Sequence, residues 1–250
     1  MENKKLFYVL LAASTFGLLC VYSYAFTLTN VSITPLMMYV FFPLQILFNM
    51  AFFAAVILIG LALSKKVGLG TPVLEKLLQG EKVENFKSIV KKSIFWGAIS
   101  WLLINITESI FVVFCPELLN LAKTAPKPSA LQGFFASFYG GISEEILLRL
   151  FLMTLLVWLF YKIKKSDLSV WFAILISAIL FGLGHLPATA KIVPLTTCIV
   201  FRAIVLNGVV GIVYGWLYWK KGLLSAMIAH FTTDIIMHAL LPLIASMFVK

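Results

Sequence analysis

The chain has 250 residues, of which 62% are hydrophobic and 12% are charged, and its mean hydropathy is +1.03. A soluble domain carries roughly 25% charged and about 45–50% apolar residues, so this composition excludes a soluble, disordered or fibrous protein. The net charge of +10 comes from basic residues that flank apolar runs and form no aromatic-interleaved patch. The charge therefore indicates membrane topology and argues against a nucleic-acid partner.

The three cysteines, Cys20, Cys115 and Cys198, all lie in apolar runs without CxxC spacing. This spacing suggests neither a thiolate zinc site nor a disulfide framework. We expect the three to be small core residues.

A helix needs about 20 apolar residues to cross the hydrocarbon core of a bilayer. Residues 6–63 contain no Asp, Glu, Lys, Arg or His, so they must hold two spans, and the polar stretch 27–35 separates them. The first span imitates a signal peptide, but it is long enough to cross, and we expect it to be uncleaved. In chain order, the expected spans are residues 6–26, 36–63, 94–115, 137–161, 168–184, 193–219, 223–240 and a short terminal one at 240–249. The predicted fold class is an all-α, polytopic integral membrane protein with about eight transmembrane helices and the active site inside the bundle.

The polar stretch 64–93 separates the second span from the third. Thr71 and Pro72 have the order of an N-cap and a first-turn proline, and an amphipathic pattern follows. This favours a helix on the membrane surface, with a plain solvated loop as the alternative. We expect one membrane domain over 1–250, in which 1–129 holds the first spans and this loop, and 130–240 holds the catalytic core.

Lysines indicate the orientation of the chain. With the amino terminus in the cytoplasm, fourteen lysines lie on that side and three lie opposite, as the positive-inside rule requires. With 18 lysines and two arginines, the chain suits an A/T-rich genome, and we expect a multi-pass protein of a bacterial plasma membrane. In this orientation Glu144 would lie one or two turns from the outer surface, which places the site in the outer half of the membrane.

Nine ionisable residues fall inside or at the edge of predicted spans. A charged residue at the centre of a span costs about 2.5–3.5 kcal/mol on insertion scales, so these side chains should converge on one another or on water. They are Glu108, Glu144, Glu145, Arg149, His185, Arg202, His230, Asp234 and His238.

The segment 140–149 holds two glutamates and an arginine. Glu145 and Arg149 are four residues apart, so they share a helix face and can neutralise each other. Glu144 points about 100° away without a helical partner, which makes it a candidate general base acting on water. The alternative is that both acids stabilise a helix start after the two glycines at 140 and 141.

Histidines mark two further segments. His185 follows Phe181 at the end of a span, where an interfacial role is the alternative. His230 and Asp234 lie side by side at helical spacing within an apolar span, where a purely structural role is the less favoured reading. His238 suits an interfacial helix end. Glu108 and Arg202 suit interhelical hydrogen bonding, and Arg202 is also a candidate to offset the acidic surplus of the site.

The motifs E-E-x-x-x-R at 144–149, F-x-x-x-H at 181–185 and H-x-x-x-D at 230–234 occur in this order across three helical regions. Together they resemble the CPBP family, which comprises the type II CAAX prenyl endopeptidases and bacterial Abi immunity and bacteriocin-processing proteins. The resemblance covers about residues 130–240. One departure is Asp234, where the prenyl endopeptidases usually have Asn, and it favours a bacterial homologue.

The resemblance implies an intramembrane endopeptidase in which Glu144 and His185 activate the attacking water. His230 and Asp234 would bind the oxyanion, while Glu145 and Arg149 would hold the first glutamate in place. An ionised carboxylate cannot donate to an oxyanion, so we expect Asp234 to orient and charge His230 instead.

The family has often been described as metalloproteases, and the same residue types suit zinc. The sequence has no H-E-x-x-H motif, and using all four residues as ligands would leave no evident general base. We therefore favour a mechanism without a cofactor. Zinc is the alternative, with Glu144, His185, His230 and Asp234 as its ligands.

The expected partners are the lipid bilayer and a peptide or protein substrate within the membrane. Two other functions compete with the protease: a non-catalytic peptide-binding or immunity protein, and a proton-coupled polytopic transporter. The sequence lacks the internal repeat that many transporters show.

Overall fold

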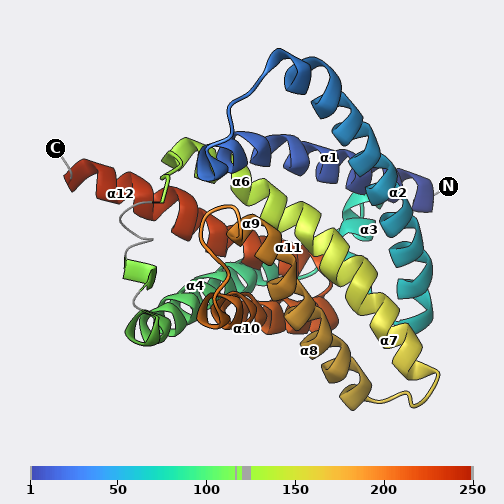
Figure 1. Cartoon of the computed structure of the whole chain (residues 1–250). Coiled ribbons are helices and arrows are strands. Elements are labelled where there is room, and N and C mark those ends of the chain that lie inside the picture. The colour runs from blue at the N-terminus through green and yellow to red at the C-terminus, as the bar shows by residue number, and fades with distance from the viewer. Residues whose placement is uncertain (1, 116, 120–124, 249–250) are drawn as a thin grey trace.

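A computed structural model describes residues 2–115, 117–119 and 125–248, and these residues form a bundle of helices without a strand (Figure 1). Six helices are long and apolar enough to cross a membrane: Lys4–Thr29, Met37–Val67, Phe86–Phe114, Asp167–Thr189, Thr197–Lys221 and Leu223–Phe248. The prediction of an all-α polytopic membrane protein is confirmed.

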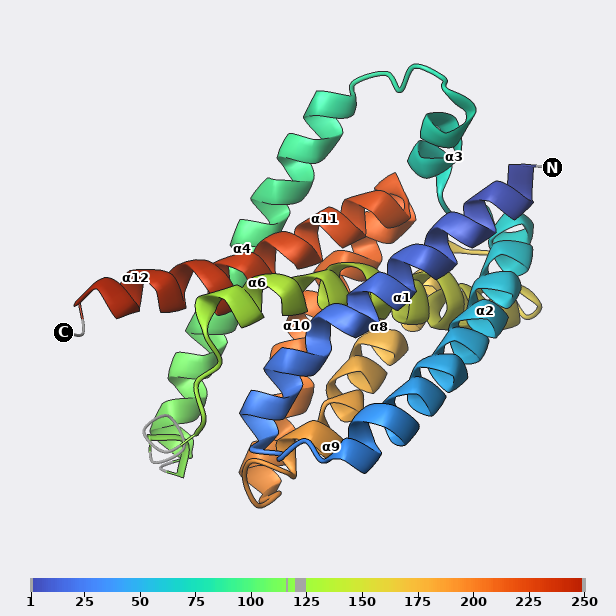
Figure 2. The ribbon, with the colours of Figure 1, turned by 90° about the horizontal axis from the view of Figure 1, so that it is seen from above.

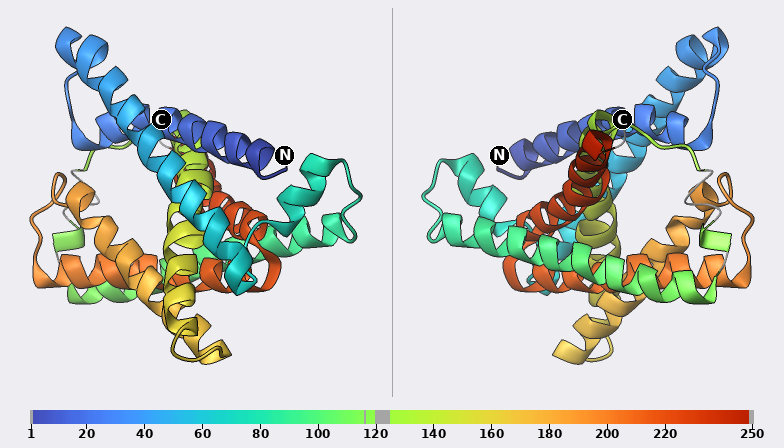
Figure 3. Two further views of the ribbon diagram at one scale, coloured as in Figure 1. Left: turned by 90° about the vertical axis from the view of Figure 1, so that its right-hand side faces the viewer. Right: turned by 90° about the vertical axis from the view of Figure 1, so that its left-hand side faces the viewer.

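A further helical run extends from Ala130 to Tyr161 and is divided into four elements by changes in its hydrogen-bond pattern. These are α6 (Ala130–Phe138), η2 (Tyr139–Glu144), η3 (Ile146–Met153) and α7 (Thr154–Tyr161), of which η2 and η3 are π-helical. The run crosses the middle of the molecule (Figure 3). It contacts α1 and α2 on one side and α8, α10 and α11 on the other.

The first part of the chain supplies α1 (Glu2–Thr29), η1 (Met37–Phe41), α2 (Phe42–Val67), α3 (Pro72–Gln79) and α4 (Phe86–Phe114). The last part supplies α8 (Asp167–Gly184), α9 (Leu186–Thr189), α10 (Thr197–Lys221), α11 (Leu223–Asp234), η4 (Ile235–Leu240) and α12 (Leu241–Phe248). The last three elements are continuous (Figure 2). The two spans expected at 223–240 and 240–249 are therefore one helical run over the described residues.

The amphipathic helix expected in the 64–93 stretch is α3, which begins at Pro72 directly after Thr71. It docks on the protein: the Lys5 Nζ donates to the Leu78 carbonyl at 2.8 Å, and the Leu223 N–H donates to the Gly70 carbonyl at 2.9 Å. Because these bonds join it to the starts of α1 and α11, α3 closes one end of the bundle.

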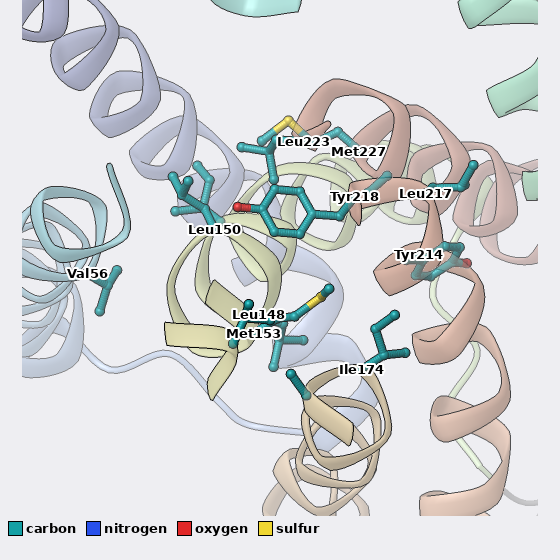
Figure 4. Packing of buried hydrophobic residues seen from close by; sticks show 14 of the residues in the cluster. Val56, Leu148, Leu150, Met153, Ile174, Tyr214, Leu217, Tyr218, Leu223 and Met227 are labelled. Atoms are coloured by element: carbon teal, nitrogen blue, oxygen red, sulfur yellow. The ribbon is translucent and has the colours of Figure 1, made fainter. Parts of the chain in front are cut away.

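The hydrophobic core gathers where η3, α8, α10 and α11 meet (Figure 4). Large side chains without solvent exposure fill it, among them Leu150, Met153, Ile174, Tyr214 and Leu223. The helices η3 and α11, which carry parts of the acidic motifs, therefore pack against a rigid, close-packed core.

A disulfide joins Cys115, which follows α4, to Cys198 at the start of α10, with 6.2 Å between their Cα atoms. The prediction that these cysteines are unpaired core residues is wrong, although Cys115 is fully buried. Their sequence separation of 83 gives no local signal, because the pairing arises only from the packing of α4 against α10. Cys20 is a free thiol, as expected.

Candidate active site

The backbone that carries the acidic motif is π-helical on both sides of Glu145, so its turns are wider than those of an α-helix. Asp234 is the last residue of α11, and the π-helical η4 follows it directly. Single π-helical turns are rare and occur often at functional sites. The rotation of 100° per residue that was expected for an α-helix therefore does not hold in the segment 139–153.

Glu145 and Arg149 form the predicted ion pair, with 3.4 Å between Oε2 and Nε, and both side chains are 0% exposed. The Arg149 Nη2 also donates to the Gly211 carbonyl at 3.1 Å. The guanidinium lies over the rings of Phe181 and Tyr214, at 5.4 and 5.6 Å from their centroids. The pair is thus enclosed by η3, α8 and α10, away from solvent.

Glu145 has a second partner that the sequence did not indicate. Its Oε1 lies 2.7 Å from the Nδ1 of His230. A carboxylate paired with arginine accepts hydrogen bonds, so Nδ1 carries the proton and Nε2 is left for other partners. The ring of Tyr214 stacks on the imidazole at 4.6 Å, which fixes its plane. Glu145, and not Asp234, is therefore the group that orients His230.

The Nε2 of His230 faces two more carboxylates. Glu144 Oε2 lies at 3.8 Å and Asp234 Oδ2 at 3.7 Å from this nitrogen. Both distances exceed a direct hydrogen bond and suit a bridging water. The side chains of Glu144 and Asp234 are 19% and 14% exposed, whereas Glu145 is fully buried. The cluster thus has a dry inner carboxylate and two outer carboxylates within reach of water.

Gly140 forms one wall of this space. A Cβ at this position would collide with the Oδ2 of Asp234 and would lie 3.1 Å from the Nε2 of His230. The η2 backbone therefore lies so close to the polar cluster that a side chain at position 140 would collide with it. The sequence suggested only that the glycine interrupts a helix.

His185 borders the cluster without contacting its carboxylates. Its Nδ1 lies 2.9 Å from the Phe181 carbonyl, which makes Nδ1 the donor and leaves Nε2 as an acceptor. Its ring meets the edge of Phe181 at 4.8 Å, and Phe181 in turn meets His230 at 5.8 Å. Among the described residues, no carboxylate oxygen comes within 4.0 Å of a ring nitrogen of His185. The joint action of His185 and Glu144 on a water, which the resemblance implies, therefore stays a prediction.

Two other intramembrane groups lie outside the cluster. Arg202 binds Glu108 through two hydrogen bonds of 2.6 and 2.8 Å, which link α10 to α4. The expected interhelical role is confirmed, and the expectation that Arg202 offsets the acidic site is wrong, because its charge is used by Glu108. The Nδ1 of His238 lies 3.1 Å from the Tyr24 hydroxyl, so this histidine joins η4 to α1 and does not end a helix.

Tyr214 is the main residue of the site that the sequence did not indicate. Its hydroxyl donates to the Thr233 Oγ1 at 2.7 Å, and that hydroxyl donates to the Gly97 carbonyl at 2.9 Å. This chain of bonds ties α10, α11 and α4 together behind His230. A tyrosine within an apolar span is a visible signal of a buried polar group. Nothing in the spacing of Tyr214 connects it to the H-x-x-x-D motif at 230–234.

The helix that carries Glu144 starts earlier than the sequence predicted. The helical run begins at Ala130, so Glu144 lies fourteen residues into it. His230 lies seven residues after Leu223, about 10 Å from the start of α11. The run starts seven residues before the span expected at 137–161, so Glu144 lies further from the start of its helix than the hydropathy indicated.

The residue types at the site suit zinc, but their arrangement does not. Within the residues that the structure describes, no group of three or more His, Cys, Asp or Glu side chains is placed to hold a metal ion.

The fold and the site define a polytopic helical membrane protein with a cluster of three carboxylates, an arginine and a histidine inside its bundle. Residues 126–236 match the family model "Type II CAAX prenyl endopeptidase Rce1-like", and this range includes all three motifs. The match supports the assignment of the chain to the CAAX protease-like family. No curated protein and no solved structure matches the chain.

Proposed function

We propose that this protein is an intramembrane endopeptidase that hydrolyses a peptide bond of a membrane-associated protein or peptide. The family match supports a CAAX-type protease in the membrane. The observation that carries the proposal is the convergence of Glu144 and Asp234 on the free nitrogen of His230, inside the bundle.

In the proposed reaction, a water molecule held at Glu144 attacks the carbonyl carbon of the scissile bond. Glu144 takes the proton of this water as the new C–O bond forms, and it later gives the proton to the departing amine as the C–N bond breaks. The 3.8 Å between Glu144 and His230 leaves space for oxygen atoms between the two groups.

His230 is the proposed donor to the oxyanion of the tetrahedral intermediate. Its charged form, with protons on both ring nitrogens, is stabilised by Glu145 at Nδ1 and by Asp234 beside Nε2. Asp234 thus keeps the role of charging His230, while Glu145 takes over the role of orienting it. Glu145, Arg149 and Tyr214 are positioning residues, because each acts through His230 or through another member of the cluster.

His185 is proposed to contact the water or the substrate from the side of α8. Its Nδ1 is occupied by the Phe181 carbonyl, so its Nε2 is an acceptor for a proton of water. Closure of this helix end toward Glu144 would complete the site that the family resemblance implies. We propose that no metal takes part, and zinc is the alternative.

The test is cleavage of tagged membrane peptides by the purified protein, with products mapped by mass spectrometry. Glu144→Gln should abolish cleavage and leave the thermal unfolding temperature unchanged, because it keeps the shape of the side chain and removes the base. Glu81→Gln, on an exposed loop residue, is the matched control and should cleave at the wild-type rate. Equal cleavage by both variants would refute the role of Glu144. Wild-type protein that retains peptides without cutting them would favour the peptide-binding alternative.

A further inference from the structure

A cavity of about 780 Å³ lies between the first turns of α4 and the last turns of α10. It is separate from the carboxylate cluster and contains none of its residues. Figure 2 shows the start of α4 at the same end of the bundle as α3 and the N-terminus. This is the lysine-rich end of the protein.

Three cations and no acidic residue line the cavity. The cations are Lys92 on α4 and Lys220 and Lys221 at the end of α10. Over the described residues, no ion pair engages any of the three, and all three side chains are exposed. The Lys220 Nζ lies 3.3 Å from the centroid of the Trp219 ring, which holds it beside the opening. The rim therefore carries positive charge that the protein does not neutralise.

The floor of the cavity is aromatic and apolar. Trp96 and Trp216 meet edge to face at 5.3 Å, and Leu217 beside them is 2% exposed. Tryptophan prefers the level of lipid headgroups, where its ring is apolar and its N–H is wet. Next to the cavity, Ile94 and Phe95 on α4 are 46% and 58% exposed and offer a surface for acyl chains.

We propose that this cavity binds the phosphate-bearing headgroup of an anionic phospholipid. The three lysines bind the phosphate, the tryptophans pack against the glycerol region, and the acyl chains leave along the exposed face of α4. Basic pockets between transmembrane helices recognise anionic headgroups in this way. A soluble phosphate would use the lysines alone and would gain nothing from the apolar floor.

The experiment measures lipids that the full-length protein retains when it is extracted from phosphatidylcholine vesicles containing phosphatidylglycerol, by native mass spectrometry. Lys92→Gln, Lys220→Gln and Lys221→Gln are combined in one variant. Lys162→Gln, Lys164→Gln and Lys165→Gln form the matched control, which removes the same charge from the loop between α7 and α8. Each lysine near a phosphate contributes about fivefold in affinity, so the cavity variant should bind phosphatidylglycerol about 100-fold more weakly.

Wild-type protein and the control variant should retain phosphatidylglycerol in preference to phosphatidylcholine. Equal retention by the cavity variant and the control variant would overturn the proposal, and so would the absence of a headgroup preference in the wild type. Inorganic phosphate at millimolar concentration is a second arm, and full displacement of the lipid by it would assign the site to free phosphate. Thermal unfolding of each variant shows that it is folded, and the preference of the wild type tests the proposal without any variant.

Discussion

Glu145 joins two parts of the chain that lie 85 residues apart, because one of its oxygens faces Arg149 and the other binds His230. All three side chains are 6% exposed or less. The carboxylate therefore holds His230 from a position without solvent exposure. Glu145 contributes to the orientation and charge of His230, whereas Glu144 remains partly exposed.

Removal of Arg149 should unfold part of this arrangement. Arg149→Ala leaves Glu145 with His230 as its only charged partner, and breaking a buried pair costs about 3–5 kcal/mol. We expect a marked loss in thermal unfolding temperature and in activity. The combined change of Glu145→Gln and Arg149→Met should recover stability without recovering turnover, because His230 then lacks the carboxylate that stabilises its charged form. A stable, fully active Arg149→Ala protein would refute the pairing argument.

A metal-free reaction makes a direct analytical prediction. Active preparations should contain substoichiometric zinc by elemental analysis, and cleavage should continue in the presence of a strong chelator. The physical reason is that the proposed reaction uses Glu144 as its base and His230 as its oxyanion donor. Activity that is lost with the chelator and returns only with added zinc would establish the alternative.

The Ala130–Tyr161 run brings its backbone, as well as its side chains, to the site. Two π-helical segments flank Glu145, and Gly140 lies against Asp234 and His230. The widened turns allow Glu144 and Glu145 to reach opposite sides of one imidazole, although the two residues are adjacent in sequence. The path of the main chain through this run therefore sets the geometry of the site.

A side chain at position 140 tests this closeness. Gly140→Ala should displace the Asp234 carboxylate, because the new Cβ would occupy the position of its Oδ2. We expect cleavage to fall at least tenfold while the protein stays folded, measured as turnover together with thermal unfolding. Gly184→Ala, where an added Cβ meets nothing within 4 Å, is the matched control and should behave as the wild type. Equal activity of the two variants would show that Asp234 need not stay where the structure places it.

Sequence reasoning predicted the features that depend on local patterns. Hydropathy indicated the membrane helices, and the spacing of Glu145 and Arg149 indicated their ion pair. It missed the contact between Glu145 and His230 and the Cys115–Cys198 disulfide, because both arise from the packing of distant helices. The π-helical turns were also missed, since an apolar pattern reports periodicity and not hydrogen-bond register.

At the scale of the whole molecule, two independent features predict the same orientation in the membrane. The lysine distribution predicts that the loop containing α3 faces the cytoplasm. The disulfide lies at the opposite end, where α4 ends and α10 begins, and disulfides persist in oxidising compartments outside the cytosol. Both features therefore place the end with Cys115 outside.

Cysteine labelling in intact cells checks this orientation. In a variant with Cys20→Ala, an impermeant thiol reagent should modify a cysteine introduced at Leu186 and should not modify one introduced at Lys164. The reason is that α8 crosses the membrane between these positions. Labelling at Lys164 alone would invert the topology and would move the lysine-rich cavity to the outer surface.

The Cys115–Cys198 bond also has a consequence for how the site is assembled. It closes a covalent ring that contains both glutamates, Arg149 and His185, whereas His230 and Asp234 lie outside the ring on α11. Both cysteines leave the ribosome before α11 does, so the ring can close while the cluster still lacks His230 and Asp234. The protein is therefore divisible into a cross-linked part that carries Glu144 and Glu145 and a late helical part that brings His230 and Asp234 to them. Because α11 packs between α4 and η2, the carboxylate–histidine cluster is complete only after this helix has inserted.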